Sequence, residues 1–224
     1  MKKVFIAVVL GLLSGLTFAQ NPIAQDEPED GIKILTLVLM IEGGYLDASE
    51  RIEELNAKEI YLDDYINSHP KSCEAYNLRG QVKKVKGEYV SAIQDLRKAV
   101  SLGTKYLGSA YEDIAECKSK LNDFYGAKES YTIALQYSEA DMPKMKARIN
   151  AGLAYVLFKL KDFSQALNNA NLAVTLDPEY AYFVFLRGLI NLQLAEKEKG
   201  CLDLSKAGEM GYSKSYEVMK EVCK

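Results

Sequence analysis

Apolar residues recur at helical spacing along most of this chain, and small residues occupy matching places within that pattern. Three segments share one order: a polar turn, an aromatic residue, and an alanine three positions after the aromatic. These segments are residues 87–92, 122–127 and 161–166. A further alanine follows seven positions later in each, at Ala99, Ala134 and Ala173. Strand signals are scarce, so the pattern predicts antiparallel helix pairs joined by short polar turns.

The spacing between equivalent alanines indicates a repeat. The steps are 35 residues (92 to 127) and 39 residues (127 to 166). The longer step includes the additional residues 138–143, which we interpret as a lengthened loop rather than a break in register. A period of about 34 residues built from helix pairs is typical of tetratricopeptide repeats.

Individual positions strengthen this resemblance to the tetratricopeptide repeat family. Its motif places a large residue at the fourth position, a small one at the eighth, an aromatic at the seventeenth, and small residues at the twentieth and twenty-seventh. The repeat that opens at Cys73 supplies them in order: Tyr76, Gly80, Tyr89, Ala92 and Ala99. The third repeat ends Leu176-Asp177-Pro178, which matches the proline often found at the thirty-second position. Small residues let two helices approach closely where they cross.

The resemblance implies an all-α fold, a right-handed α-solenoid of stacked antiparallel helix pairs that ends in a C-terminal capping helix. The expected pairs occupy residues 32–69, 73–106, 108–141, 147–180 and 181–208, and the cap occupies residues 212–224. The first pair is about ten residues longer than the usual period. Either a helix from Leu46 runs on to Asn67, or a short extra helix begins near Ala57.

The N-terminus has the features of a secretory signal. Two lysines precede an apolar stretch at residues 4–16, and Thr17-Phe18-Ala19 provides a small-x-small cleavage site. A membrane anchor is the alternative, but a membrane span requires about 20 apolar residues. We therefore expect removal of residues 1–19 and a periplasmic or secreted protein without stable membrane insertion. Residues 20–31 hold two prolines and four carboxylates, which favours a flexible acidic leader.

The charge balance bears on the class of partner. Removal of Lys2 and Lys3 leaves 26 Lys and Arg (28 − 2) against 31 Asp and Glu, a net charge of −5. Nucleic-acid binding requires clustered Lys and Arg. A mildly acidic chain is therefore a poor candidate for nucleic-acid binding, and we expect a protein or peptide partner instead.

Candidate catalytic and metal-binding residues are few. His69 is the one histidine, and it stands beside Pro70 at an expected helix end, where a surface or capping role is favoured. His69 and Cys73 alone do not make a structural zinc site, which needs four ligands. Glu112 and Glu116 share a helix face, and we interpret them as a solvated face or groove wall rather than an acid–base pair. The sequence therefore predicts no enzyme activity, no cofactor and no metal.

Four cysteines in an exported protein permit three pairings. Cys201 lies early in the second helix of the last repeat, and Cys223 lies in the terminal helix. If the terminal helix folds back, a disulfide between them would staple the cap; two buried thiols are the alternative. Cys73 and Cys117 lie on first helices of neighbouring repeats and are expected to be buried thiols.

In the family, ligands usually lie along a concave surface lined by the first helices. The resemblance therefore implies a groove that grades from acidic to aromatic and suits an extended or helical peptide. The expected partner-binding residues are Glu112, Glu116, Arg148, Tyr155, Phe158, Tyr182, Phe185 and Leu189. The alternative for Phe185 and Leu189 is packing under the terminal helix, because the last repeat must be capped.

Together these features predict a non-catalytic, exported scaffold that binds a peptide or protein partner in its concave groove. The alternative is a structural envelope protein that self-associates through its C-terminal repeat and forms a homodimer.

Overall fold

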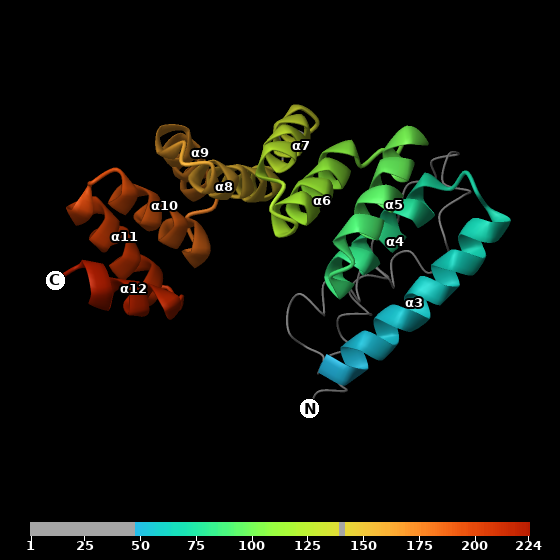
Figure 1. Ribbon diagram of the computed structural model, residues 1–224, viewed down its shortest axis with the longest axis horizontal. Coiled ribbons are helices and arrows are strands. Elements are labelled where there is room, and N and C mark those ends of the chain that lie inside the picture. Colours follow the sequence, from blue (N-terminus) through green and yellow to red (C-terminus); the bar gives the residue numbers. More distant parts are fainter. Residues whose placement is uncertain (1–47, 139–141) are drawn as a thin grey trace.

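The computed structural model describes residues 48–138 and 142–224, and the side chains from residue 52 onward. The described ranges contain ten α-helices and no strand. The helices stack in an elongated, curved row that begins with α3 and ends with α12 (Figure 1). The expected signal peptide, the leader and the start of the first helix pair lie outside the described residues.

The helix that opens the row, α3 (Ala48–Ser68), is continuous through Ala57, in agreement with the first of the two alternatives. Four antiparallel pairs and a terminal helix follow. They are α4 (Cys73–Lys86) with α5 (Tyr89–Ser101), α6 (Leu107–Lys120) with α7 (Phe124–Gln136), α8 (Pro143–Lys159) with α9 (Phe163–Leu176), α10 (Ala181–Gln193) with α11 (Lys197–Glu209), and then α12 (Lys214–Val222). The all-α solenoid expected from the repeats is confirmed.

The turn within each pair has a shared backbone conformation. In each turn between a first and a second helix, one residue has a positive φ: Gly87 (83°), Asn122 (61°), Lys161 (64°) and Ala195 (62°). Glycine adopts this conformation without a steric cost, whereas a Cβ crowds the following carbonyl. In the second turn Asp123 then caps the next helix, because its carboxylate accepts the N–H of Gly126 at 2.9 Å.

Small residues lie where the paired helices cross, as the repeat pattern predicts. The recurring alanines are all 0% exposed, namely Ala92, Ala99, Ala127, Ala134, Ala166 and Ala173. At Gly80 an added Cβ would lie 2.7 Å from Cγ of Leu96, which is closer than real side chains approach. The backbones of α4 and α5 can approach this closely because residue 80 has no side chain.

A terminal cap closes the apolar end of the row. Helix α12 packs on α11, and the ring of Tyr216 covers Gly208, where a Cβ would lie 2.6 Å from Cζ. A disulfide joins Cys201 of α11 to Cys223, with their Cα atoms 5.8 Å apart. The terminal helix therefore folds back on the last pair, and the disulfide expected in that case is present.

Candidate binding surfaces

The first helices α4, α6, α8 and α10 contact one another in order and form one surface, which we call the first-helix face. It runs along the stack from α4 toward α10 (Figure 1). All eight residues that the sequence singled out for partner binding lie on α6, α8 and α10. Their environments differ enough to separate them into three groups.

The charged end of the first-helix face is neutralised by contacts between repeats. Lys84 of α4 reaches across to α6 and donates to Asp113 at 2.6 Å and to Glu116 at 2.8 Å. Gln81 donates to the same Asp113 at 3.2 Å. The acidic character expected for this part of the surface is thus balanced within the chain, although the Glu116 side chain remains 41% exposed.

Glu112 is a buried ion-pair partner and lies outside the solvated surface that the sequence suggested. It is 4% exposed, and its two carboxylate oxygens accept Nε and Nη2 of Arg148 at 2.9 and 3.0 Å. Burial raises the pKa of Glu112 to about 7, against the opposing effect of the Arg148 hydrogen bond. Of this pair Arg148 faces the solvent, because its side chain is 56% exposed.

Aromatic residues of α8 form the middle of the first-helix face. Tyr155 and Phe158 are half-buried and pack against the main apolar core. Lys159 is exposed, and its Nζ lies 5.7 Å from the ring centroid of Tyr155 and 6.0 Å from that of Phe124. A cation within about 6 Å of an aromatic face is attracted to it. This region therefore presents partly exposed rings beneath a positive charge.

The aromatic residues of α10 belong to the capped end. The ring centroids of Phe185 and Tyr212 are 4.7 Å apart, and those of Tyr182 and Tyr212 are 5.9 Å apart. Phe185 is 9% exposed, and Leu189 packs against the same apolar cluster under the terminal helix. Burial raises the pKa of Tyr182 to about 12. Phe185 and Leu189 thus pack under the terminal helix, which was the alternative to a role in partner binding.

Three further chemically reactive side chains are those of His69, Cys73 and Cys117. His69 is exposed at the end of α3, and its ring stacks on Tyr65 with centroids 4.3 Å apart. Burial raises the pKa of Cys73 to about 11 and that of Cys117 to about 12. Both thiols are therefore protonated at neutral pH, and a protonated thiol is a weak nucleophile.

The described residues contain no group of three or more His, Cys, Asp and Glu side chains that could hold a metal ion. Within the same part of the chain, every helix is too short or too polar to cross a membrane.

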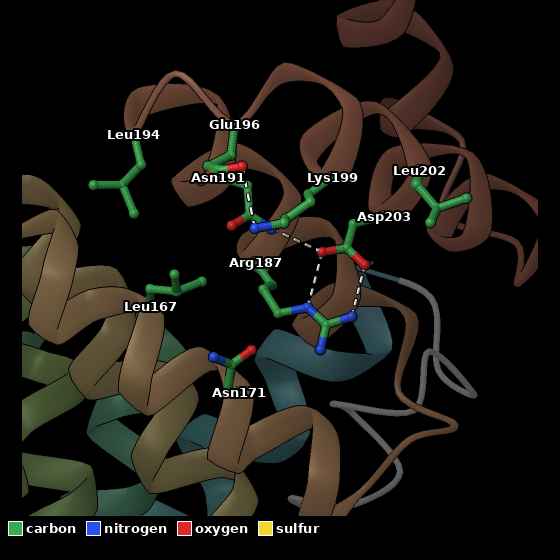
Figure 2. A pocket seen from close by; sticks show the side chains of 9 residues that line it. All are labelled: Leu167, Asn171, Arg187, Asn191, Leu194, Glu196, Lys199, Leu202 and Asp203. Carbon is green, nitrogen blue, oxygen red and sulfur yellow. Dashed lines mark hydrogen bonds and ion pairs between the residues drawn. The ribbon is translucent and has the colours of Figure 1, made fainter.

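A pocket of about 490 Å³ lies between α9, α10 and α11 (Figure 2). At its floor, Arg187 donates through Nε and Nη2 to the two oxygens of Asp203, at 2.8 and 2.6 Å. Asn191 donates to the same carboxylate at 3.2 Å. Three leucines and further polar groups complete the lining: Leu167, Asn171, Leu194, Glu196, Lys199 and Leu202. The sequence analysis missed this pocket.

Comparisons with known proteins agree with this architecture. Residues 147–180 match a family model described as tetratricopeptide repeat. The DnaJ homolog subfamily C member 7 homolog of Schizosaccharomyces pombe is 28% identical over 182 residues, or 75% of this chain. This chain spans only 38% of the length of that protein.

Solved structures show the same fold at low sequence identity. MamA superposes with a TM-score of 0.64 at 16% identity, over 77% of this chain and 99% of MamA. YrrB, described as a TPR protein with an unusual peptide-binding site, gives 0.63 at 18% identity, over 89% of this chain and 95% of YrrB. The fold is thus that of a protein built from stacked helical repeats. More specifically, residues 147–180 match a tetratricopeptide repeat, and the chain has the fold of tetratricopeptide repeat proteins.

Proposed function

We propose that this protein is an exported, non-catalytic scaffold that binds a protein or peptide partner along the first-helix face. The observation that carries the proposal is the partly exposed aromatic surface of Tyr155 and Phe158 beside the cation of Lys159. The neighbouring charges of Lys84 on α4 and Glu112 on α6 are already paired within the chain. The aromatic surface is therefore the part of the first-helix face that we expect to contact a partner. Aromatic side chains with an adjacent cation suit a peptide that brings apolar and acidic groups.

Export is the second element of the proposal. Residues 1–19 have the pattern of a cleavable signal, and disulfides such as Cys201–Cys223 persist in oxidising compartments. Intact-mass measurement of the protein from its native envelope fraction tests this: we expect a chain that begins at Gln20. A mass that retains residues 1–19 contradicts cleavage.

Site-specific photo-cross-linking tests the binding surface. A photoreactive residue replaces Tyr155 in one variant and Tyr125 in a matched control; Tyr125 is a tyrosine of α7 that is 79% exposed. We expect a discrete adduct with one partner from position 155 and none from position 125. Equal adducts from both positions would contradict a specific first-helix surface.

A loss-of-contact variant completes the test. Tyr155→Ala combined with Lys159→Ala should remove one ring of the aromatic surface and its cation, while Phe158 and the crossing alanines of α8 and α9 stay in place. We expect loss of partner capture with an unchanged melting temperature within a few degrees. Phe185→Ala is unsuitable for this purpose, because truncating a buried Phe costs about 3–5 kcal/mol of folding stability.

Self-association through the C-terminal repeat is the second candidate function. Exposed apolar residues on α11 and α12, Leu202 and Tyr216, are the observation that favours it. Light scattering of the mature chain separates the two proposals. A monomer supports partner binding, whereas a stable homodimer that Leu202→Asp dissociates supports self-association.

A further inference from the structure

Arg187 stands at the centre of the pocket between α9, α10 and α11, and its guanidinium is only partly used. Nε and Nη2 donate to Asp203, and Nη1 has no partner among the described residues. Figure 2 shows the guanidinium between Asp203 on one side and Asn171 on the other. Its side chain is 25% exposed, so a ligand in the pocket can reach the remaining nitrogen.

The pair α4–α5 contains the same Arg–Asp arrangement, and here the arginine binds one further carboxylate. Arg79 donates through Nε and Nη2 to Asp95 at 2.8 and 2.6 Å, the distances seen at Arg187. Its Nη1 donates in addition to Asp63 of the preceding helix α3, at 2.7 Å. One guanidinium in this fold therefore holds two carboxylates at once, one from its own pair and one from the helix before it.

The arginine of the pair α10–α11 has no second carboxylate partner among the described residues. Asp63 lies 16 residues before Arg79, and the residue 16 before Arg187 is Asn171, which lines the pocket. A neutral amide thus stands at the position equivalent to that of Asp63. The carboxylates that do line the pocket are already paired, Asp203 with Arg187 and Glu196 with Lys199 at 3.1 Å.

We propose that this pocket binds the carboxylate of an Asp or Glu side chain from a partner polypeptide, in the place that Asp63 of α3 holds beside Arg79. Arg187 Nη1 donates to it, and Lys199, whose exposed ion pair with Glu196 is weak, adds a second positive charge. Leu167, Leu194 and Leu202 surround these groups, so the preferred acidic residue is flanked by apolar ones. Charge-assisted hydrogen bonds from a guanidinium to a carboxylate are among the strongest in proteins.

This inference is independent of the proposed function. None of the residues that line the pocket is among the eight expected partner-binding residues of α6, α8 and α10, so either surface can fail its test while the other holds.

A pair of short peptides tests the chemistry on the full mature chain. The probes are acetyl-Leu-Glu-Leu-amide and its matched control acetyl-Leu-Gln-Leu-amide, titrated by NMR with the backbone amides of α9 to α11 and the Arg187 Nε–H as reporters. We expect saturable shifts with the Glu peptide and an affinity about tenfold lower for the Gln peptide, because the latter loses the charge-assisted bonds. Equal affinity of the two peptides overturns the proposal.

A variant that restores the missing carboxylate gives an independent readout. Asn171→Asp should occupy Arg187 Nη1 from within the chain, as Asp63 does at Arg79, and lower the affinity for the Glu peptide about tenfold. Asn171→Ala, the matched control, should retain most of it. Lys199→Gln, a substitution of an exposed residue, should weaken the Glu peptide severalfold and leave the Gln peptide unchanged.

Two results contradict the assignment. Unchanged affinity of the Asn171→Asp variant shows that the acidic peptide does not occupy the place of the missing carboxylate. Tighter binding of inorganic phosphate than of the Glu peptide assigns the pocket to phosphate groups rather than to acidic side chains.

Discussion

Two interfaces in this molecule occupy equivalent places and differ in chemistry: the one between α3 and α4, and the one between α9 and α10. Each residue of the second lies 108 positions after its counterpart (187 − 79). The counterparts are Glu59 and Leu167, Asp63 and Asn171, Lys83 and Asn191, and Lys86 and Leu194. At α3–α4, Glu59 forms ion pairs with Lys83 and Lys86, and Asp63 forms one with Arg79. At α9–α10 the charged groups are replaced, and a pocket is open.

The difference shows that the repeat tolerates both a sealed and an open interface. The pairs α4–α5 and α10–α11 share small residues at their crossings and one bidentate Arg–Asp pair each. Charges from the preceding helix decide whether the space beside the arginine is filled. A solenoid can therefore acquire a binding pocket by substitution of a few interface charges without change to its backbone.

The largest expected effect concerns the shared Arg–Asp pair. Arg187→Ala leaves Asp203, which is 7% exposed, with only the neutral Asn191 amide as a donor, and we expect a loss of about 3 kcal/mol in unfolding free energy. Arg79→Ala leaves Asp95 with the ammonium of Lys83 at 2.8 Å, so the loss should be nearer 2 kcal/mol. Urea unfolding of both variants measures the difference.

A double variant controls this measurement. Asp203→Asn in the Arg187→Ala background removes the unpaired buried charge, and about half of the lost stability should return. Equal losses from Arg79→Ala and Arg187→Ala would show that Lys83 does not support Asp95, and the contrast between the two interfaces would then be weaker than the contacts suggest.

The second-largest expected effect concerns the ion pairs of Glu59, which join α3 to α4. Glu59→Gln should lower stability by about 1–2 kcal/mol, because Lys83 and Lys86 are both largely buried and lose a carboxylate partner. Glu88→Gln is the matched control: Glu88 is the other partner of Lys86 but is 42% exposed, so its loss should stay below about 0.5 kcal/mol. Thermal melts at two salt concentrations compare them. Equal stability of the two variants would mean that ion pairs do not hold α3 against α4.

The sequence was sufficient for the helix pairs and their crossings because both depend on local patterns. Alanines at fixed spacing specify where backbones meet, so the register from Ala92 to Ala173 could be predicted. The meeting of Cys201 and Cys223 could also be anticipated, since it required only that the last helix fold back.

Contacts between repeats could not be predicted in the same way. Arg148 and Glu112 are 36 residues apart, and the choice of Glu112 over Glu116 depends on how far one repeat is shifted against the next. Many side chains of equal charge compete for such contacts, and the sequence does not rank them. The pocket at Arg187 was missed for a related reason, because Asn171 is informative only after the Asp63–Arg79 contact is known.

The third effect is in the backbone that precedes each second helix. Gly87 and its counterpart Ala195 both have a positive φ, 83° and 62°. Gly87→Ala should cost about 1 kcal/mol, and Ala195→Gly should add about 0.5 kcal/mol, because the relief at Cβ is partly offset by the greater freedom of glycine in the unfolded chain. Urea midpoints measure both changes. A loss of stability on Ala195→Gly would mean that the two turns are not equivalent, despite their shared conformation.

The smallest expected effect is a reciprocal exchange at the two places that define the comparison. Asp63→Asn should lower stability by about 0.5 kcal/mol and Asn171→Asp should raise it by a similar amount, because each pair is partly exposed and the Asp63 side chain is 48% exposed. Both changes should diminish at 1 M salt, where the Debye length falls to about 3 Å. A double-mutant cycle of Asn171→Asp with Arg187→Lys measures the coupling directly, since lysine cannot bind two carboxylates in the same fork geometry. If Asn171→Asp is neutral at low salt and shows no coupling, residue 171 does not face Arg187 as residue 63 faces Arg79, and the equivalence of the two interfaces fails.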